Sequence, residues 1–81
     1  MNAYRLELMH KSRPTLPLGV KRFQARSLND DLLGSCTAWL GDLAEQHAAP
    51  IQDACYGRVW RDDSPGLAVL VCSLAIPAGA R

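Results

Sequence analysis

Hydrophobic and polar positions alternate over residues 3–10, close to the start of the chain. One face of an extended segment there would hold three large apolar side chains: Tyr4, Leu6 and Leu8. The other face would hold Arg5 and Glu7. A period of two is typical of a half-buried β-strand, so we predict a strand over this range. Residues 20–26 are compatible with a second strand in which Phe23 is the only large side chain available for the core.

The clearest periodicity in the chain is helical and covers residues 28–47. When successive residues are placed 100° apart, the following residues share an arc of about 160°: Leu28, Leu32, Leu33, Cys36, Trp39, Leu40, Leu43, Ala44 and His47. Ser27 is a suitable N-cap, and Asp30 would complete a pair that resembles a capping box. Pro50 would end the helix soon after its last periodic residue. The opposite face carries small residues that are either merely tolerated in the helix or would let another backbone approach closely: Gly34, Ala38 and Gly41.

A hairpin is predicted for the last third of the chain. Residues 54–61 have the composition of a strand, and residues 67–76 form a longer apolar run. Between them, Pro65 and Gly66 suit the two central positions of a type II turn, which needs a fixed φ first and a positive φ second. Residues 77–81 are expected to be a flexible tail.

These elements predict one α+β domain that spans all 81 residues. The expected architecture is a small antiparallel sheet of three or four strands with one amphipathic helix packed across it. Residues 11–19 interrupt the pattern as an irregular basic loop, because Pro14 and Pro17 lack the amide donor of a strand. The strand–helix–hairpin order occurs in many unrelated proteins and does not indicate a function.

The predicted last strand is apolar on both faces, which one helix cannot cover. In a regular strand, one face would hold Leu67, Val69 and Val71, and the other Leu70, Cys72, Leu74 and Ile76. The second face would need cover from residues 11–26, from a second copy of the chain or from another protein. We therefore expect a small interaction module of accessory or regulatory type, acting as a homodimer or with a protein partner. The residues expected at the contact are Tyr56, Trp60, Leu70, Leu74 and Ile76.

Charge suggests an alternative function, binding of single-stranded nucleic acid or RNA. Residues 1–26 carry six basic side chains against Glu7, a net charge of +5, whereas residues 27–53 carry −5 and residues 54–81 carry +1. The two halves could simply neutralise each other across the fold. Alternatively, cations could contact phosphate while Tyr56 and Trp60 stack on bases. The candidate cations are Lys11, Arg13, Lys21, Arg22, Arg26 and Arg58.

The potential ligands and nucleophiles are not spaced for a known site. Structural zinc sites use paired ligands two to four residues apart, and no such pair occurs among Cys36, Cys55, Cys72, His10 and His47. Phosphate loops and the common hydrolase motifs are missing as well, so we expect a protein that is not an enzyme and uses no metal or cofactor. The N-terminus lacks the pattern of a signal peptide, and the longest apolar run is about half of a membrane span. We therefore expect a cytoplasmic protein with free thiols and no membrane partner.

Overall fold

The structure is a computed structural model that describes residues 1–47, 54–64 and 66–76. Its elements follow in the order β1 (Asn2–His10), β2 (Gly19–Ala25), α1 (Asp30–His47), β3 (Cys55–Ser64) and β4 (Leu67–Ala75). The four strands form one antiparallel sheet in the order β2-β1-β3-β4, so that β2 and β4 are its two edges. The predicted α+β fold is therefore confirmed, including the second strand. The expected tail at residues 77–81 and the proline stop at Pro50 lie outside the described residues.

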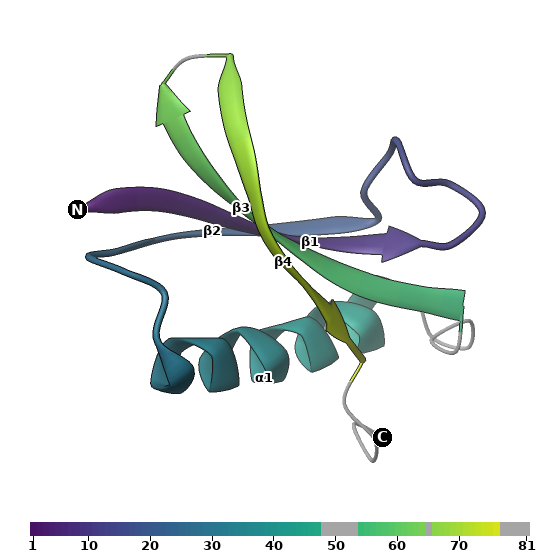
Figure 1. The fold of residues 1–81 in the computed structure, drawn as a ribbon. Helices are drawn as coiled ribbons and strands as arrows, with labels where there is room; N and C mark the ends of the chain where they lie inside the picture. The colour runs from purple at the N-terminus through teal and green to yellow at the C-terminus, as the bar shows by residue number, and fades with distance from the viewer. Residues whose placement is uncertain (48–53, 65, 77–81) are drawn as a thin grey trace.

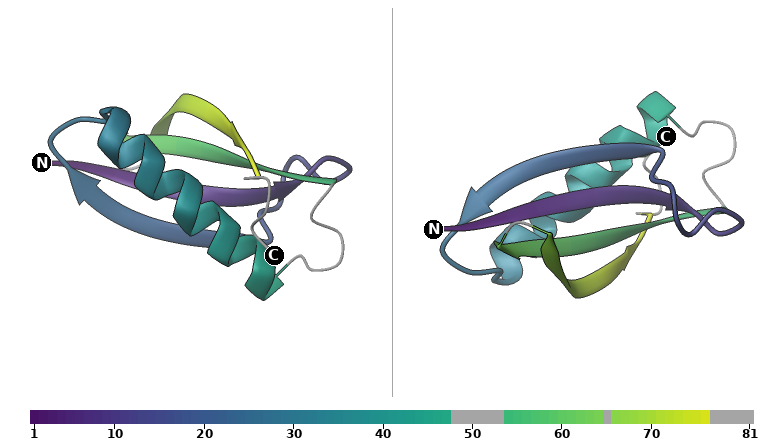
Figure 2. Two further views of the ribbon diagram at one scale, coloured as in Figure 1. Left: turned by 90° about the horizontal axis from the view of Figure 1, so that it is seen from below. Right: turned by 90° about the horizontal axis from the view of Figure 1, so that it is seen from above.

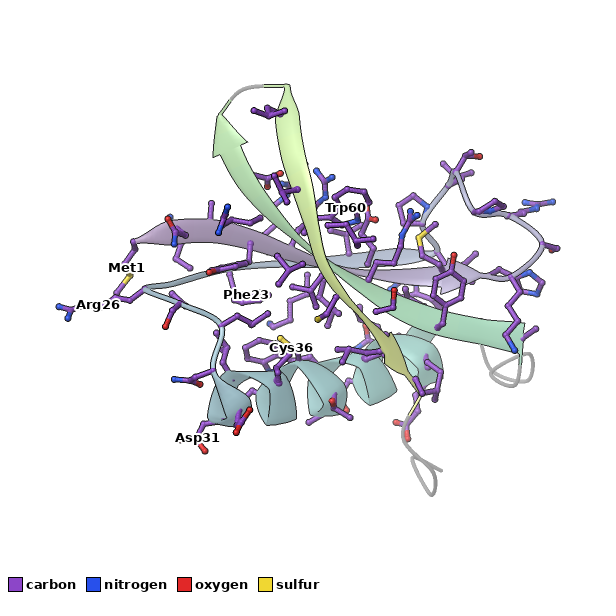
Figure 3. All side chains as sticks on the ribbon, viewed as in Figure 1. Met1, Phe23, Arg26, Asp31, Cys36 and Trp60 are labelled. Atoms are coloured by element: carbon purple, nitrogen blue, oxygen red, sulfur yellow. The ribbon has the colours of Figure 1, made fainter. Side chains whose placement is uncertain are left out.

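Helix α1 covers one face of the sheet and crosses it obliquely (Figure 1, Figure 2). We call the opposite face, which no described helix covers, the open face. The alternation of β1 directs Tyr4, Leu6 and Leu8 toward the helix, where all three are buried. Phe23 of β2 and Cys36 of α1 point into the same layer (Figure 3). The Phe23 ring stacks on Tyr4 with centroids 5.3 Å apart, so β2 contributes to the core through its one large apolar side chain.

Gly57 makes room on β3 for the side chain of Leu40 from α1. It lies opposite Leu8 in the register of the sheet, directly under the side chain of Leu40. A Cβ atom at this position would lie 2.6 Å from Leu40 Cδ2, closer than packed carbon atoms can come. The absence of a side chain at residue 57 therefore leaves the space that the side chain of Leu40 fills.

The helix begins later than predicted and uses a different cap. Asn29 Oδ1 accepts a hydrogen bond of 2.9 Å from the Leu32 backbone N–H, so Asn29 is the N-cap in place of Ser27. Asparagine caps a helix as well as serine does, and periodicity alone could not distinguish the two positions. The covered face of the helix also includes Gly41, which the pattern placed on the polar side, whereas His47 is exposed at the helix end.

The β3–β4 hairpin is longer than expected because β3 continues to Ser64. Gly66 has a φ of 79°, the value expected at the second central position of a type II turn. The register shifts twice, between Val59 and Trp60 and between Asp62 and Ser64. Such bulges increase the local twist of a strand. The tip of the hairpin rises away from the helix layer (Figure 1).

Candidate interaction surface

A β-bulge in β4 changes which residues share a face. Val59 lies opposite Cys72, but the next residue of β3, Trp60, lies opposite Leu70, so Val71 is the extra residue. Residues directly opposite each other point to the same face of a sheet, and neighbours in one strand point to opposite faces. Leu70 therefore lies on the open face with Trp60, and Cys72 lies on the helix face.

The bulge separates the five residues that were expected to form one contact surface. Tyr56 and Trp60 lie opposite Met9 and Arg5 of β1, on the open face together with Leu70. Leu74 and Ile76 instead pack against the core under α1. The prediction that Leu70 and Leu74 share a face is thus wrong, because it assumed an unbroken alternation along β4.

The exposed aliphatic side chains are concentrated in the first half of β4. The exposed fractions there are 57% for Leu67, 40% for Val69, 47% for Leu70 and 40% for Val71. We call residues 67–71 the β4 patch. No residue of the 67–76 segment is charged. Because β4 is an edge strand, the backbone N–H and C=O groups on its outer side have no partner strand within this sheet.

The other edge of the sheet has a different character. Strand β2 presents Lys21 and Arg22, and such charged side chains discourage the pairing of an edge with another chain. The sequence left open whether residues 11–26 cover the second apolar face of β4. The part of this segment that forms β2 extends the sheet at the edge opposite β4 and does not cover β4.

A polar network occupies the centre of the open face. Glu7 is only 8% exposed, although it lies on the face that α1 does not cover. Its Oε1 accepts hydrogen bonds from Trp60 Nε1 at 2.7 Å and from Arg58 Nη2 at 3.3 Å. Its Oε2 lies 3.5 Å from Arg5 Nε. Two side chains from the neighbouring strand β3 and one from β1 itself thus neutralise or hydrogen-bond one buried carboxylate, as a buried charge requires.

The indole of Trp60 is enclosed by two guanidinium groups. Arg5 Cζ lies 5.5 Å and Arg58 Cζ 5.2 Å from the centroid of the ring, both within the range of a cation–π interaction. Arg5 also pairs with Asp62 at 3.4 Å, and Arg22 approaches the same carboxylate at 3.8 Å. Arg58 and Trp60 are therefore engaged within the protein. The sequence did not indicate this network, because strand alternation shows which residues share a face but not which strands are neighbours.

The six candidate phosphate-binding cations do not lie on one surface. Lys21 is on the helix face of β2, with Nζ 5.0 Å from the Trp39 ring, whereas Arg22 is on the open face. Lys11 and Arg13 lie in the loop after β1, and Arg26 lies beyond the far end of β2. The sequence suggested that the acidic residues 27–53 neutralise the basic residues 1–26. The described ion pairs of residues 1–26 instead use the carboxylates of Glu7 and Asp62.

The thiols and histidines are placed in ordinary structural roles. All three cysteines are free, and burial raises the pKa of the Cys36, Cys55 and Cys72 thiols above the ordinary value. Ser12 Oγ lies 2.6 Å from His10 Nδ1, but the Ser12 backbone N–H donates to the same nitrogen, which is typical of a local turn. Within residues 1–47, 54–64 and 66–76, no three His, Cys, Asp or Glu side chains are grouped so as to hold a metal ion.

A shallow groove lies between β2 and α1, with a volume of about 270 Å³. It is lined by Val20, Lys21, Trp39, Asp42, Leu43 and Gln46. Lys21 lies over the indole of Trp39, so the main aromatic surface of the groove already has a partner.

Comparison with known proteins finds no matching family model, no similar curated protein and no similar solved structure. The described part of the chain has no helix that is long and apolar enough to cross a membrane. Inferences about function therefore depend on the surface of the molecule itself.

Proposed function

We propose that this chain is a small, non-enzymatic protein-interaction module of accessory or regulatory type that acts as a homodimer. The observation that supports the proposal is the β4 patch on an unpaired edge strand. An edge of this kind is a template for strand addition, and proteins that do not use such an edge usually protect it with charge, proline, a β-bulge or a covering segment. The bulge of β4 lies at Val71 and leaves the pairing of residues 68–70 regular.

The nature of the patch favours a protein partner. Pairing of the edge would satisfy the outer backbone groups of β4 and would remove four aliphatic side chains from water. The segment offers no charge with which to contact phosphate or another ionic ligand. The free thiols are compatible with action in the reducing cytoplasm, which we propose as the site of function.

Binding of nucleic acid has less support in the geometry. In that function Arg58 would contact phosphate and Trp60 would stack on a base. Both side chains instead donate hydrogen bonds to the buried carboxylate of Glu7. Titration of a labelled single-stranded oligonucleotide at about 20 mM and 200 mM salt tests this alternative, because phosphate contacts weaken steeply with salt. Tight binding at low salt that is lost at high salt would favour it over the interaction module.

The test of the proposed function is the absolute mass of the protein in solution. Light scattering on a size-exclusion peak should give twice the mass of one chain at protein concentrations in the high micromolar range, with dissociation on dilution. Val69→Lys, which places a charge in the patch, should shift this equilibrium to the single chain while circular dichroism stays unchanged. The mass of one chain for the native sequence at every concentration up to about 1 mM would refute the proposal.

A further inference from the structure

We infer that the partner of the β4 patch is a second copy of this chain, paired antiparallel so that Val69 lies opposite Val69 of the other copy on a two-fold axis. This inference rests on the self-association proposed above, and it adds the strand, the register and the symmetry. Two copies would then form one continuous eight-stranded sheet with β4 of each copy at its centre.

The bulge restricts which part of β4 can pair with another copy. Leu70 and Cys72 point to opposite faces although they are two residues apart, so the outer side of β4 is irregular around Val71. The half of the strand after the bulge carries Leu74 and Ile76 against the core and exposes only small side chains, Ser73 and Ala75. The half before the bulge holds the exposed aliphatic residues. Pairing over residues 67–71 is therefore the one that covers apolar surface.

The directions of the side chains then fix the register. Ala68 and Leu70 lie opposite Asp62 and Trp60 on the open face, and Val69 lies opposite Arg61 on the other face. Opposite residues in an antiparallel pair must point to the same face, so the two-fold axis has to pass through a residue and not between two residues. Placing it at Val69 pairs Ala68 with Leu70 and Leu67 with Val71 of the other copy. Placing it at Ala68 would leave Leu70 opposite Gly66 and would cover less of the patch. Placing it at Leu70 would set Ala68 opposite Cys72, which points to the other face.

The chemistry of the strand suits a second copy. An isologous interface places the same residues on both sides, so any charge near the axis would meet its own copy. The 67–76 segment has no charge, and the proposed pairs are aliphatic, with the small Ala68 opposite the larger Leu70. The same operation applied to β2 with the axis at Lys21 or at Arg22 would set that basic residue against its own copy. The hairpin tip also extends away from α1, which leaves its outer edge accessible (Figure 1).

A charge-swap experiment tests the register. Val69→Lys and Val69→Glu are each expected to weaken the dimer at least about tenfold, because like charges would lie opposite each other at the axis. An equimolar mixture of the two variants should form a heterodimer with an affinity at least about tenfold above that of either variant alone, because opposite charges would then meet. Native mass spectrometry identifies the heterodimer if one variant is labelled with ¹⁵N.

Matched variants at Ser73 provide the control. Ser73 is exposed on the same strand but lies beyond the bulge, so Ser73→Lys and Ser73→Glu should change the dissociation constant less than about threefold. If the native protein is a dimer but the Val69 mixture shows no rescue, or if the Ser73 pair shows the rescue instead, the inferred register is wrong and the proposed self-association stands. If the native protein does not self-associate, the inferred register and the proposed function are both wrong.

Discussion

The open-face network makes a quantitative prediction for the substitution Glu7→Gln. Glutamine has nearly the shape of glutamate, so the packing around residue 7 is retained and only the charge is lost. The carboxylate accepts from Trp60 Nε1 at 2.7 Å and from Arg58 Nη2 at 3.3 Å. In the variant these become hydrogen bonds to a neutral oxygen, and the new amide group faces the guanidinium of Arg5 without an acceptor.

The expected cost follows from the strengths of the two kinds of hydrogen bond. A bond to a charged group contributes about 1.5–3 kcal/mol and a neutral one about 0.5–1.5 kcal/mol. Two such bonds change in the variant, so the free energy of unfolding should fall by about 2 kcal/mol. For a domain of this size, each kcal/mol corresponds to about 4–8 °C, so the Tm should fall by about 8–16 °C.

Thermal and urea unfolding followed by circular dichroism measure this change. Arg22→Gln is the matched control, because it also removes one charge from the open face, but from a side chain that is 73% exposed and 3.8 Å from Asp62. An exposed ion pair of this kind should contribute less than about 0.5 kcal/mol. If the two variants lose the same small amount of stability, the reasoning that Glu7 organises the open face is wrong.

Four further predictions concern the fold and the thiols. Asn29→Ala should lower the free energy of unfolding by about 1 kcal/mol in urea titrations, and Ser27→Ala should have little effect, since Asn29 is the cap. Gly57→Ala should destabilise by about 1–3 kcal/mol because no room for a methyl group exists under the helix, whereas Gly34→Ala, with open space around it, should stabilise by about 1 kcal/mol. Alkylation followed by mass spectrometry should modify the partly exposed Cys72 first. Stability should fall above about pH 8.5, where thiols ionise in the unfolded chain but stay protonated in the native one.

Local patterns were sufficient to predict the fold. Strand β1 and helix α1 each span a run with one clear period, and the helix could be recognised because its apolar residues recur over five turns. Strands β3 and β4 could be recognised from their composition and from the turn between them. The short connection of β3 to β4 identifies these strands as neighbours in the sheet. The position of β1 between β2 and β3 could not be predicted in this way, since it depends on pairing between residues far apart in the chain.

The same limit explains what the sequence did not indicate about the surface. Glu7 meets Arg58 and Trp60 across more than 50 residues, and nothing in the local pattern around any of them identifies the others. A strict alternation along β4 predicts that Leu70 and Leu74 share a face. The bulge between them cannot be recognised from that pattern. The apolar character of β4 was apparent from composition, whereas the division of its residues between core and patch required the register.

The contrast between the two edges of the sheet is the strongest argument that the β4 patch has a function. Both edges belong to one small sheet and are subject to the same risk of pairing with other chains. At β2 that risk is countered by Lys21 and Arg22, yet the longer edge at β4 has no charged residue at all. A single Glu in place of Val69 would reduce the risk at little cost to the fold, because that side chain is already 40% exposed and lies opposite Arg61. An edge that remains apolar where protection would cost so little is best explained by a partner that pairs with it, and the uncharged strand is suited to pairing with its own copy.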